Sequence, residues 1–200
     1  MLSYYNKLSS EVYDLDKPIG HSFGDIEFYS KRLASISGPI LEPATGTGRI
    51  LIPLLEEGFK VDGFDISNEM LTICRENCHK RGLNPNLFEA KMESFSLKAK
   101  YEAIIIPSGT FLLLYERERS IQALHNFYRH LVDGGKLIID IFLQTEIDLG
   151  KVYTRTWTCK NGDVITLETT NVEVDYINHM DDMRNGEMVH SYKLNWSGFP

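Results

Sequence analysis

The feature that most constrains the fold is an alternation of short, apolar, β-branched runs with helical segments between residues 25 and 142. Strands are predicted at 40–42, 59–65, 86–90, 103–106 and 136–142. Helices are predicted at 25–34, 47–57, 68–80 and 116–131. Ser67 is the expected N-cap of the third helix, Gly82 its end, and Gly134-Gly135 the end of the fourth. Apolar strands separated by helices are typical of a parallel sheet covered on both faces. The sequence therefore predicts an α/β fold with a doubly wound, Rossmann-like, mostly parallel sheet.

The pattern changes after Gly150, where hairpin-turn dipeptides replace helical segments. Asn161-Gly162 and Asn185-Gly186 are both favoured in two-residue hairpin turns. They separate strand-like segments at 152–159, 164–176 and 188–196. These segments predict a C-terminal antiparallel β meander.

Charge and composition narrow the partners and the compartment. Two hundred residues suffice for one domain with a small appendage. The chain carries 21 basic and 28 acidic residues, and this balance disfavours a broad nucleic-acid surface. Its three cysteines form no disulfide framework, and we expect no metal site and a reducing, cytoplasmic location. The N-terminus lacks an apolar signal core and the apolar stretches are too short to cross a bilayer, so no membrane anchorage is expected.

The strongest chemical signal is the segment EPATGTGR, from Glu42 to Arg49, between the first predicted strand and the first following helix. Gly46 and Gly48 permit a tight turn and a close approach of the backbone to a ligand. Amide groups at the start of the helix can hold a carboxylate. Asp65 follows at the tip of the second strand, where a carboxylate can accept both hydroxyls of a ribose. Together these residues predict a nucleotide-type site.

Five segments, taken in order, resemble the class I S-adenosylmethionine-dependent methyltransferase family over residues 38–142. The segments are ILEPATGTGR, VDGFDISNEML, NLFEAKMESF, YEAIIIPSG and LVDGGKLIIDI. Alanine stands at position 44, where the family usually has glycine, and lysine at position 91, where it often has an acidic residue. The resemblance implies an S-adenosyl-L-methionine cofactor and a methyl-transfer activity.

The resemblance also implies roles for individual residues. Glu42 would orient the amino group of the methionine part, and Asp65 would hold the ribose. Ile66 and Met92 would enclose the adenine, with Glu93 near its polar edge. The expected cofactor-binding residues are Tyr13, Glu42, Ala44, Gly46, Thr47, Gly48, Arg49, Asp65, Ile66, Met70, Met92, Glu93, Pro107 and Ser108. No residue stands out as a catalytic base.

Three regions are expected along the chain: an N-terminal helical lid or arm at 1–37, an S-adenosylmethionine-binding domain at 38–150, and the meander at 151–200. The arm could close over the cofactor or pack on the surface. The meander could finish the sheet in altered form, or cover the substrate and leave the fifth strand's edge open to dimerisation. Arg49, at a helix start, indicates a ligand carboxylate or a fixed acidic partner, and a solvent-exposed arginine is an equal alternative.

Two other functions remain open at this point. A non-catalytic protein could keep the cofactor cleft without an acceptor. A nicotinamide-dependent oxidoreductase is disfavoured because Leu51 occupies the position where its fingerprint has a third small residue. The turn Ile106-Pro107-Ser108-Gly109 lacks the Asn/Asp-Pro-Pro-aromatic tetrapeptide of enzymes that methylate adenine or glutamine. We therefore expect a small-molecule methyl acceptor, with a protein or RNA acceptor as the less favoured alternative and a homodimer as a further expectation.

Overall fold

The computed structural model describes residues 5–141, 148–159 and 162–171, and the backbone of five short strands between residues 174 and 197. The chain divides into two compact units, Met1–Ile141 and Phe142–Pro200. Each is described on its own. Among the described residues, no helix combines the length and the apolar character needed to cross a bilayer.

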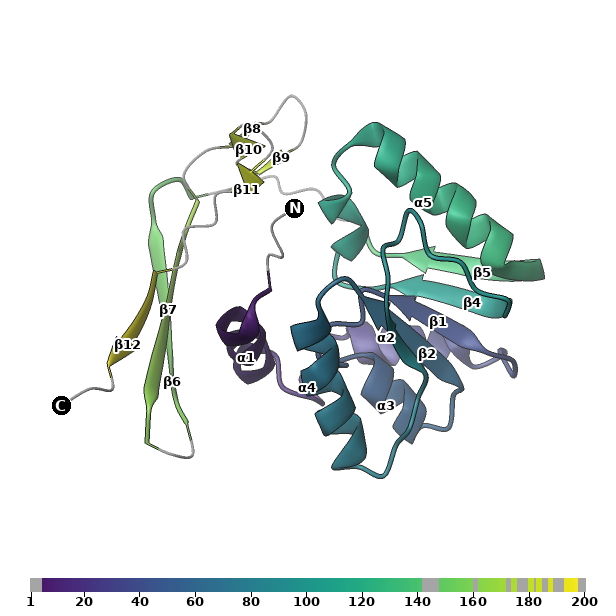
Figure 1. The fold of residues 1–200 in the computed structure, drawn as a ribbon, viewed down its shortest axis with the longest axis horizontal. Coiled ribbons are helices and arrows are strands. Elements are labelled where there is room, and N and C mark those ends of the chain that lie inside the picture. Colours follow the sequence, from purple (N-terminus) through teal and green to yellow (C-terminus); the bar gives the residue numbers. More distant parts are fainter. Residues whose placement is uncertain are drawn as a thin grey trace. The chain divides into compact units, whose positions relative to one another are not determined.

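The first unit is built on a five-stranded parallel sheet with the order β3-β2-β1-β4-β5 (Figure 1). Its strands are β1 Ile40–Pro43, β2 Val61–Asp65, β3 Leu87–Glu89, β4 Tyr101–Ile106 and β5 Leu131–Ile139. Ile40 of β1 lies opposite Val61 of β2 and opposite Ala103 of β4. The chain order therefore reverses between β1 and β4, which is the topological switch point of a doubly wound sheet. The predicted fold class is confirmed.

The helices of this unit cover both faces of the sheet (Figure 1). They are α1 Lys7–Asp16, α2 Asp25–Leu33, α3 Leu51–Glu56, α4 Asn68–His79 and α5 Arg117–His130, with a short 3-10 helix, η1, at Thr110–Leu113. As predicted, Ser67 caps α4: its Oγ accepts a hydrogen bond from the Met70 amide at 3.2 Å. Gly82 follows with a left-handed φ of 70°.

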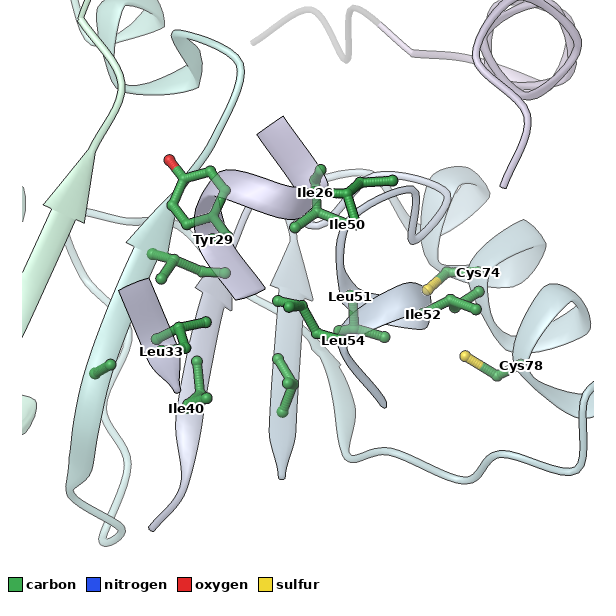
Figure 2. Packing of buried hydrophobic residues seen from close by; sticks show 13 residues of the cluster. Ile26, Tyr29, Leu33, Ile40, Ile50, Leu51, Ile52, Leu54, Cys74 and Cys78 are labelled. Carbon is green, nitrogen blue, oxygen red and sulfur yellow. The ribbon is translucent and has the colours of Figure 1, made fainter. Parts of the chain in front are cut away.

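Alternate residues along the strands feed two separate hydrophobic clusters. Ile40, Ala103 and Ile105 pack on one face against helices α2, α3 and α4. Figure 2 shows this cluster, with Cys74 and Cys78 of α4 beside Ile52 and with the Tyr29 hydroxyl at its rim. On the other face, Leu41, Ile104 and Ile106 pack with residues of α5. Because side chains of a strand point alternately to its two faces, this pattern explains why the strands read as continuous apolar runs.

Several element boundaries differ from those predicted, most of all at the start of α3 and at both ends of β5. The helix expected at 47–57 begins at Leu51, because the preceding residues turn through left-handed backbone at Gly46 and Gly48. Gly134-Gly135 does not end α5, which stops at His130 and continues directly into β5. The two glycines instead lie in an irregular stretch of β5, between its pairings with Tyr101 and Ala103. The strand predicted at 136–142 instead spans Leu131–Ile139, and Phe142 lies outside the described residues.

The second unit contains a three-stranded antiparallel sheet with the order β12-β7-β6. Its strands are β6 Val152–Thr158, β7 Val164–Thr170 and β12 Lys193–Ser197. Thr158 pairs with Val164 across the predicted Asn161-Gly162 turn. Two further short pairs are β8 Val174–Asp175 with β9 Met180–Asp181, and β10 Met183–Arg184 with β11 Glu187–Met188.

The antiparallel character of this unit agrees with the prediction, but two details differ or lie outside it. The strand predicted at 164–176 ends at Thr170, and β8 is a separate short strand. Arg184 pairs with Glu187 on either side of positions 185–186, as a two-residue hairpin requires, although those two residues lie outside the described part.

Candidate functional site

The carboxyl ends of β1 and β4 carry the two residues with the most unusual backbone. In the part of the chain that the structure describes, Ala44 (φ 55°) and Ser108 (φ 59°) are the two non-glycine residues with a left-handed φ. Ala44 follows β1, and Ser108 follows β4 after Pro107. Such strain persists where the surrounding structure holds it, and it clusters at functional sites. In open α/β sheets ligands bind at this same switch point.

The loop after β1 and the acid at the tip of β2 are directly joined. The Gly46 amide donates a hydrogen bond to Asp65 Oδ2 at 2.9 Å, and the Ser67 amide donates to Asp65 Oδ1 at 2.9 Å. Burial raises the pKa of Asp65, and the backbone amides oppose that rise. The Ile66 amide also acts on this carboxylate, which has about four lone-pair sites in all, so it can still accept a hydrogen bond from a ligand.

Glu42 contributes a buried carboxyl group at the same end of the sheet. The region at the carboxyl ends of β1, β2 and β4 is called the crevice below. It is 3% exposed, and its Oε2 has no hydrogen-bond partner among the described residues. Burial raises the pKa of Glu42 to about 8, and the nearby Arg49 charge opposes this shift. The buried hydroxyl of Thr47 also has no hydrogen-bond partner among the described residues, whereas the Thr45 hydroxyl lies close enough to Glu42 to lower its pKa. Since buried polar groups are normally hydrogen-bonded, this set fits a polar ligand that brings donors and acceptors with it.

Gly46 and Gly48, the two glycines of the loop, differ in how much space surrounds them. A side chain at Gly46 would meet only Tyr13, whose Cε1 lies 3.8 Å from the Cβ position. A side chain at Gly48 would lie 2.9 Å from Cys74 Sγ and 2.9 Å from Ile52 Cδ1. Gly48 is therefore required by packing against α3 and α4, although the sequence suggested close approach to a ligand.

Arg49 has a fixed acidic partner, one of the three alternatives that the sequence left open, and it is not exposed to solvent. Its Nη2 lies 2.5 Å from Asp25 Oδ2 at the start of α2, and its side chain is 5% exposed. Asp25 lies in a segment in which the sequence indicated only a helix. A pair separated by 24 positions leaves no local signal, so sequence reasoning missed Asp25.

Tyr13 reaches the crevice from α1. Burial raises the pKa of its hydroxyl, Arg49 opposes that rise, and the carboxyl groups of Glu42 and Asp65 reinforce it. Tyr13 therefore lies among the candidate residues, as expected.

Two hydrogen bonds attach α1 and the residues before it to α4 and its N-cap: Ser67 Oγ donates to the Tyr5 carbonyl at 2.9 Å, and Asn77 Nδ2 donates to Asp14 Oδ1 at 2.9 Å.

Asn77 is a second residue that sequence reasoning missed. Its amide nitrogen also donates to the Thr47 carbonyl at 3.3 Å, so it connects α1 with the loop after β1. A polar residue on the inner, apolar face of α4, between Cys74 and Cys78, is the signal that could have identified it.

The residues expected around adenine do not all come together. Ile66 is 49% exposed and lines a surface pocket of about 390 Å³ together with Phe88 and Lys91. Met92 instead packs in the core cluster that includes α5, and Met70 is buried on α4. Glu93 pairs with Arg119 of α5, with 2.7 Å between Oε1 and Nη2. Only Ile66 of these residues lines the pocket.

Histidines and cysteines outside the crevice have packing roles. His130 Nε2 accepts a hydrogen bond from the Leu97 amide at 3.0 Å, and its Nδ1 lies 2.7 Å from the Asn126 carbonyl oxygen. Cys74 and Cys78 are buried free thiols. Across the described residues, no three His, Cys, Asp or Glu side chains are grouped as metal ligands would be.

Comparison with known proteins places this geometry in a family. Residues 40–135 match the family described as "Methyltransferase domain". A glycine/sarcosine N-methyltransferase from Halorhodospira halochloris is 37% identical over 103 residues, which are 50% of this chain and 38% of that protein. The putative methyltransferase YqeM from Bacillus subtilis (strain 168) is 31% identical over 106 residues, 52% of this chain and 42% of that protein. The chain thus covers well under two thirds of these relatives.

Solved structures of similar fold extend over more of the chain. The sugar N-methyltransferase KedS8 from Streptoalloteichus superposes with a TM-score of 0.67 and 22% identity, covering 88% of this chain and 71% of that one. The aminopentose methyltransferase CalS10 from Micromonospora echinaspora, solved with S-adenosylmethionine bound, gives a TM-score of 0.64 at 18% identity, covering 88% and 73%. At these identities the likeness concerns the fold. The sequence match, the strand order and the loop at the switch point agree, and residues 40–135 belong to the class I S-adenosylmethionine-dependent methyltransferase family.

Proposed function

We propose that this chain is an S-adenosylmethionine-dependent methyltransferase that acts on a small-molecule acceptor in the cytoplasm. The observation that carries the proposal is the 2.9 Å hydrogen bond from the Gly46 amide to Asp65 Oδ2. It brings the glycine loop and the acid of the next strand to one crevice at the switch point, where the ends of an adenosyl amino acid can be held together. The free cysteines fit a reducing compartment.

The side chains of the crevice fit the groups of this cofactor. The unpartnered Oε2 of Glu42 suits the ammonium group of the methionine part. The remaining lone pairs of Asp65 suit the two ribose hydroxyls, and the exposed face of Ile66 suits the adenine. When bound, S-adenosylmethionine supplies an activated methyl group on a sulfonium, so the work left to this chain is to hold the donor and the acceptor in line.

An amine is the acceptor class best supported. Among the similar proteins, one from Halorhodospira halochloris is named a glycine/sarcosine N-methyltransferase, and one from Streptomyces venezuelae is named an N,N-dimethyltransferase of an amino sugar nucleotide. In this chain the carboxylate of Asp140 follows β5 and accepts the Ser108 amide at 3.0 Å. A carboxylate next to the β4 turn favours a positively charged amine, which must lose a proton before it is methylated. We also propose that the protein is a homodimer, since an open edge of β5 would favour pairing.

Calorimetry with S-adenosylmethionine, S-adenosylhomocysteine and NAD tests the cofactor. We expect both adenosyl ligands to bind and NAD not to bind. Asp65→Ala should weaken binding of S-adenosylhomocysteine by more than tenfold, because a ribose bound by two hydrogen bonds to a carboxylate loses both. Asp62→Ala is the matched control on the same strand, where the carboxylate accepts a hydrogen bond from the Tyr101 hydroxyl at 3.0 Å. Equal losses in the two variants would count against the assignment.

Transfer of labelled methyl groups tests catalysis separately from binding. We expect label to appear in one or more members of a panel of small amines, including glycine, sarcosine and amino sugars, when wild-type protein and labelled S-adenosylmethionine are mixed. Binding of the cofactor without transfer to any member of the panel or of a cell metabolite extract would favour a non-catalytic binding protein.

A further inference from the structure

The turn after β4 is held in a conformation that serine does not favour. Ser108 and Gly109 have left-handed φ values of 59° and 66°, and the Thr110 amide donates a hydrogen bond to the Pro107 carbonyl at 3.1 Å. Positive φ at both central residues is the type I′ pattern, which strongly favours Gly, Asn or Asp. Ser108 therefore carries strain at the first central position, and something in the surrounding structure must hold it there.

Two contacts hold Ser108 from opposite sides. Asp140 Oδ2 accepts the Ser108 amide hydrogen at 3.0 Å. Arg49 Nη2 donates a hydrogen bond to Ser108 Oγ at 2.7 Å. Asp140 binds the backbone of Ser108 and Arg49 binds its side chain, so the two contacts fix both the conformation of the turn and the direction of the hydroxyl group.

The guanidinium of Arg49 is itself held by hydrogen bonds to three residues. Its Nη1 donates to the His21 carbonyl and to Asp25 Oδ1, both at 3.1 Å. Its Nη2 donates to Asp25 Oδ2 at 2.5 Å in addition to Ser108 Oγ. The four terminal N–H bonds of an arginine thus all have partners within the protein. Arg49 is buried, at 4% exposure, and with these partners its terminal N–H groups leave no donor to spare for a ligand carboxylate.

We propose that Arg49 is a positioning residue that, with Asp140, keeps the Pro107–Thr110 turn in its left-handed form as a preorganised wall of the crevice. The inference rests on the proposed function, because the crevice between the ends of β1 and β4 is taken to be the cofactor site. It differs from the role that the sequence resemblance implied for Arg49. The arginine acts on the ligand through Ser108 and not by touching it.

Two substitutions at position 108 separate strain from the hydroxyl contact. Ser108→Ala keeps the Cβ atom, and therefore the strain, but removes the acceptor for Arg49. Ser108→Gly also removes the acceptor, but glycine adopts the left-handed turn without cost. We expect Ser108→Ala to weaken binding of S-adenosylhomocysteine by about fivefold or more, and Ser108→Gly to recover most of that loss.

The decisive measurement is a double-variant comparison with Arg49→Lys. Lysine keeps a positive charge near Asp25 but has no planar fork with which to hold Asp25 and Ser108 at once. We expect Arg49→Lys alone to weaken binding of S-adenosylhomocysteine, and to weaken it much less when position 108 is glycine. Arg75→Lys is the matched control, because Arg75 donates to the Leu87 carbonyl at 3.3 Å and makes no contact with the turn. It should leave the affinity unchanged.

The outcomes are distinct. Equal losses in Ser108→Ala and Ser108→Gly would show that the hydroxyl itself serves the ligand, and would overturn the proposal. An equal effect of Arg49→Lys with serine or glycine at position 108 would also overturn it. If the wild-type protein bound no S-adenosylhomocysteine, the proposed function would fail. The melting temperatures of the wild type, Arg49→Lys, Ser108→Gly and the double variant would then decide separately whether Arg49 and Ser108 are coupled through the turn.

Discussion

Glu42 has a carboxyl group that is buried without a complete set of hydrogen bonds. It stands one residue before the end of β1, in the most central strand of the sheet, and its Oε2 lacks a partner among the described residues. Burial is the main cause of its raised pKa. Such a group is costly to the fold unless a ligand supplies the missing interaction. Because the pKa of Glu42 differs between the folded and unfolded states, the free energy of unfolding depends on pH.

The free energy of unfolding should therefore fall as pH rises from about 4.5 to about 8. The unfolded chain loses the Glu42 proton near the ordinary value of 4.5, whereas the folded chain keeps it up to about 8. Between these values the folded state binds more protons, so raising the pH favours unfolding by at most about 1.4 kcal/mol per pH unit from this group. Urea denaturation at several pH values measures the slope, and Glu42→Gln should flatten it. A slope that is unchanged in Glu42→Gln would show that other groups cause it.

At the scale of elements, the loop between β1 and α3 is held by packing as well as by hydrogen bonds. Gly48→Ala should lower the free energy of unfolding by about 1–3 kcal/mol, because its methyl group would press on α3 and α4 in addition to the left-handed strain. Gly46→Ala has the strain without the close contacts, and should cost about 1 kcal/mol. Urea denaturation of the two variants makes the comparison. A greater loss in Gly46→Ala would contradict this account of the packing.

The sequence predicted the strands and most helices, because their patterns are local. It could not predict which side chains after β3 face the pocket. The chain turns there, with the Phe95 amide donating to the Lys91 carbonyl at 2.9 Å. That turn directs Met92 into the core and leaves the pocket to Ile66 and Lys91. The contact between Arg49 and Asp25 was equally beyond reach, because it depends on how α2 packs and not on any neighbouring residue.

At the scale of the whole molecule, both hydrophobic clusters belong to the first unit. Their members lie between Ile19 and Ile139, and no described residue of the second unit belongs to either cluster. A chain that ends at Ile141 should therefore unfold cooperatively and still bind S-adenosylhomocysteine. Circular dichroism during heating and calorimetry measure the two properties. Loss of cooperative unfolding in this shortened chain would show that the second unit is needed to complete the core.

The hydrogen bonds of Asn77 connect the opening of α1 to the state of the loop after β1. Its amide group is shared between Asp14 of α1 and the carbonyl of Thr47, next to the glycine loop. A ligand that immobilises this loop should also slow the opening of α1, including residues of α1 that do not touch the ligand. Hydrogen–deuterium exchange of residues 7–16 with and without S-adenosylhomocysteine measures this, and Asn77→Ala should abolish the slowing. Hydrogen exchange in the N-terminal helix would then report whether the crevice is filled.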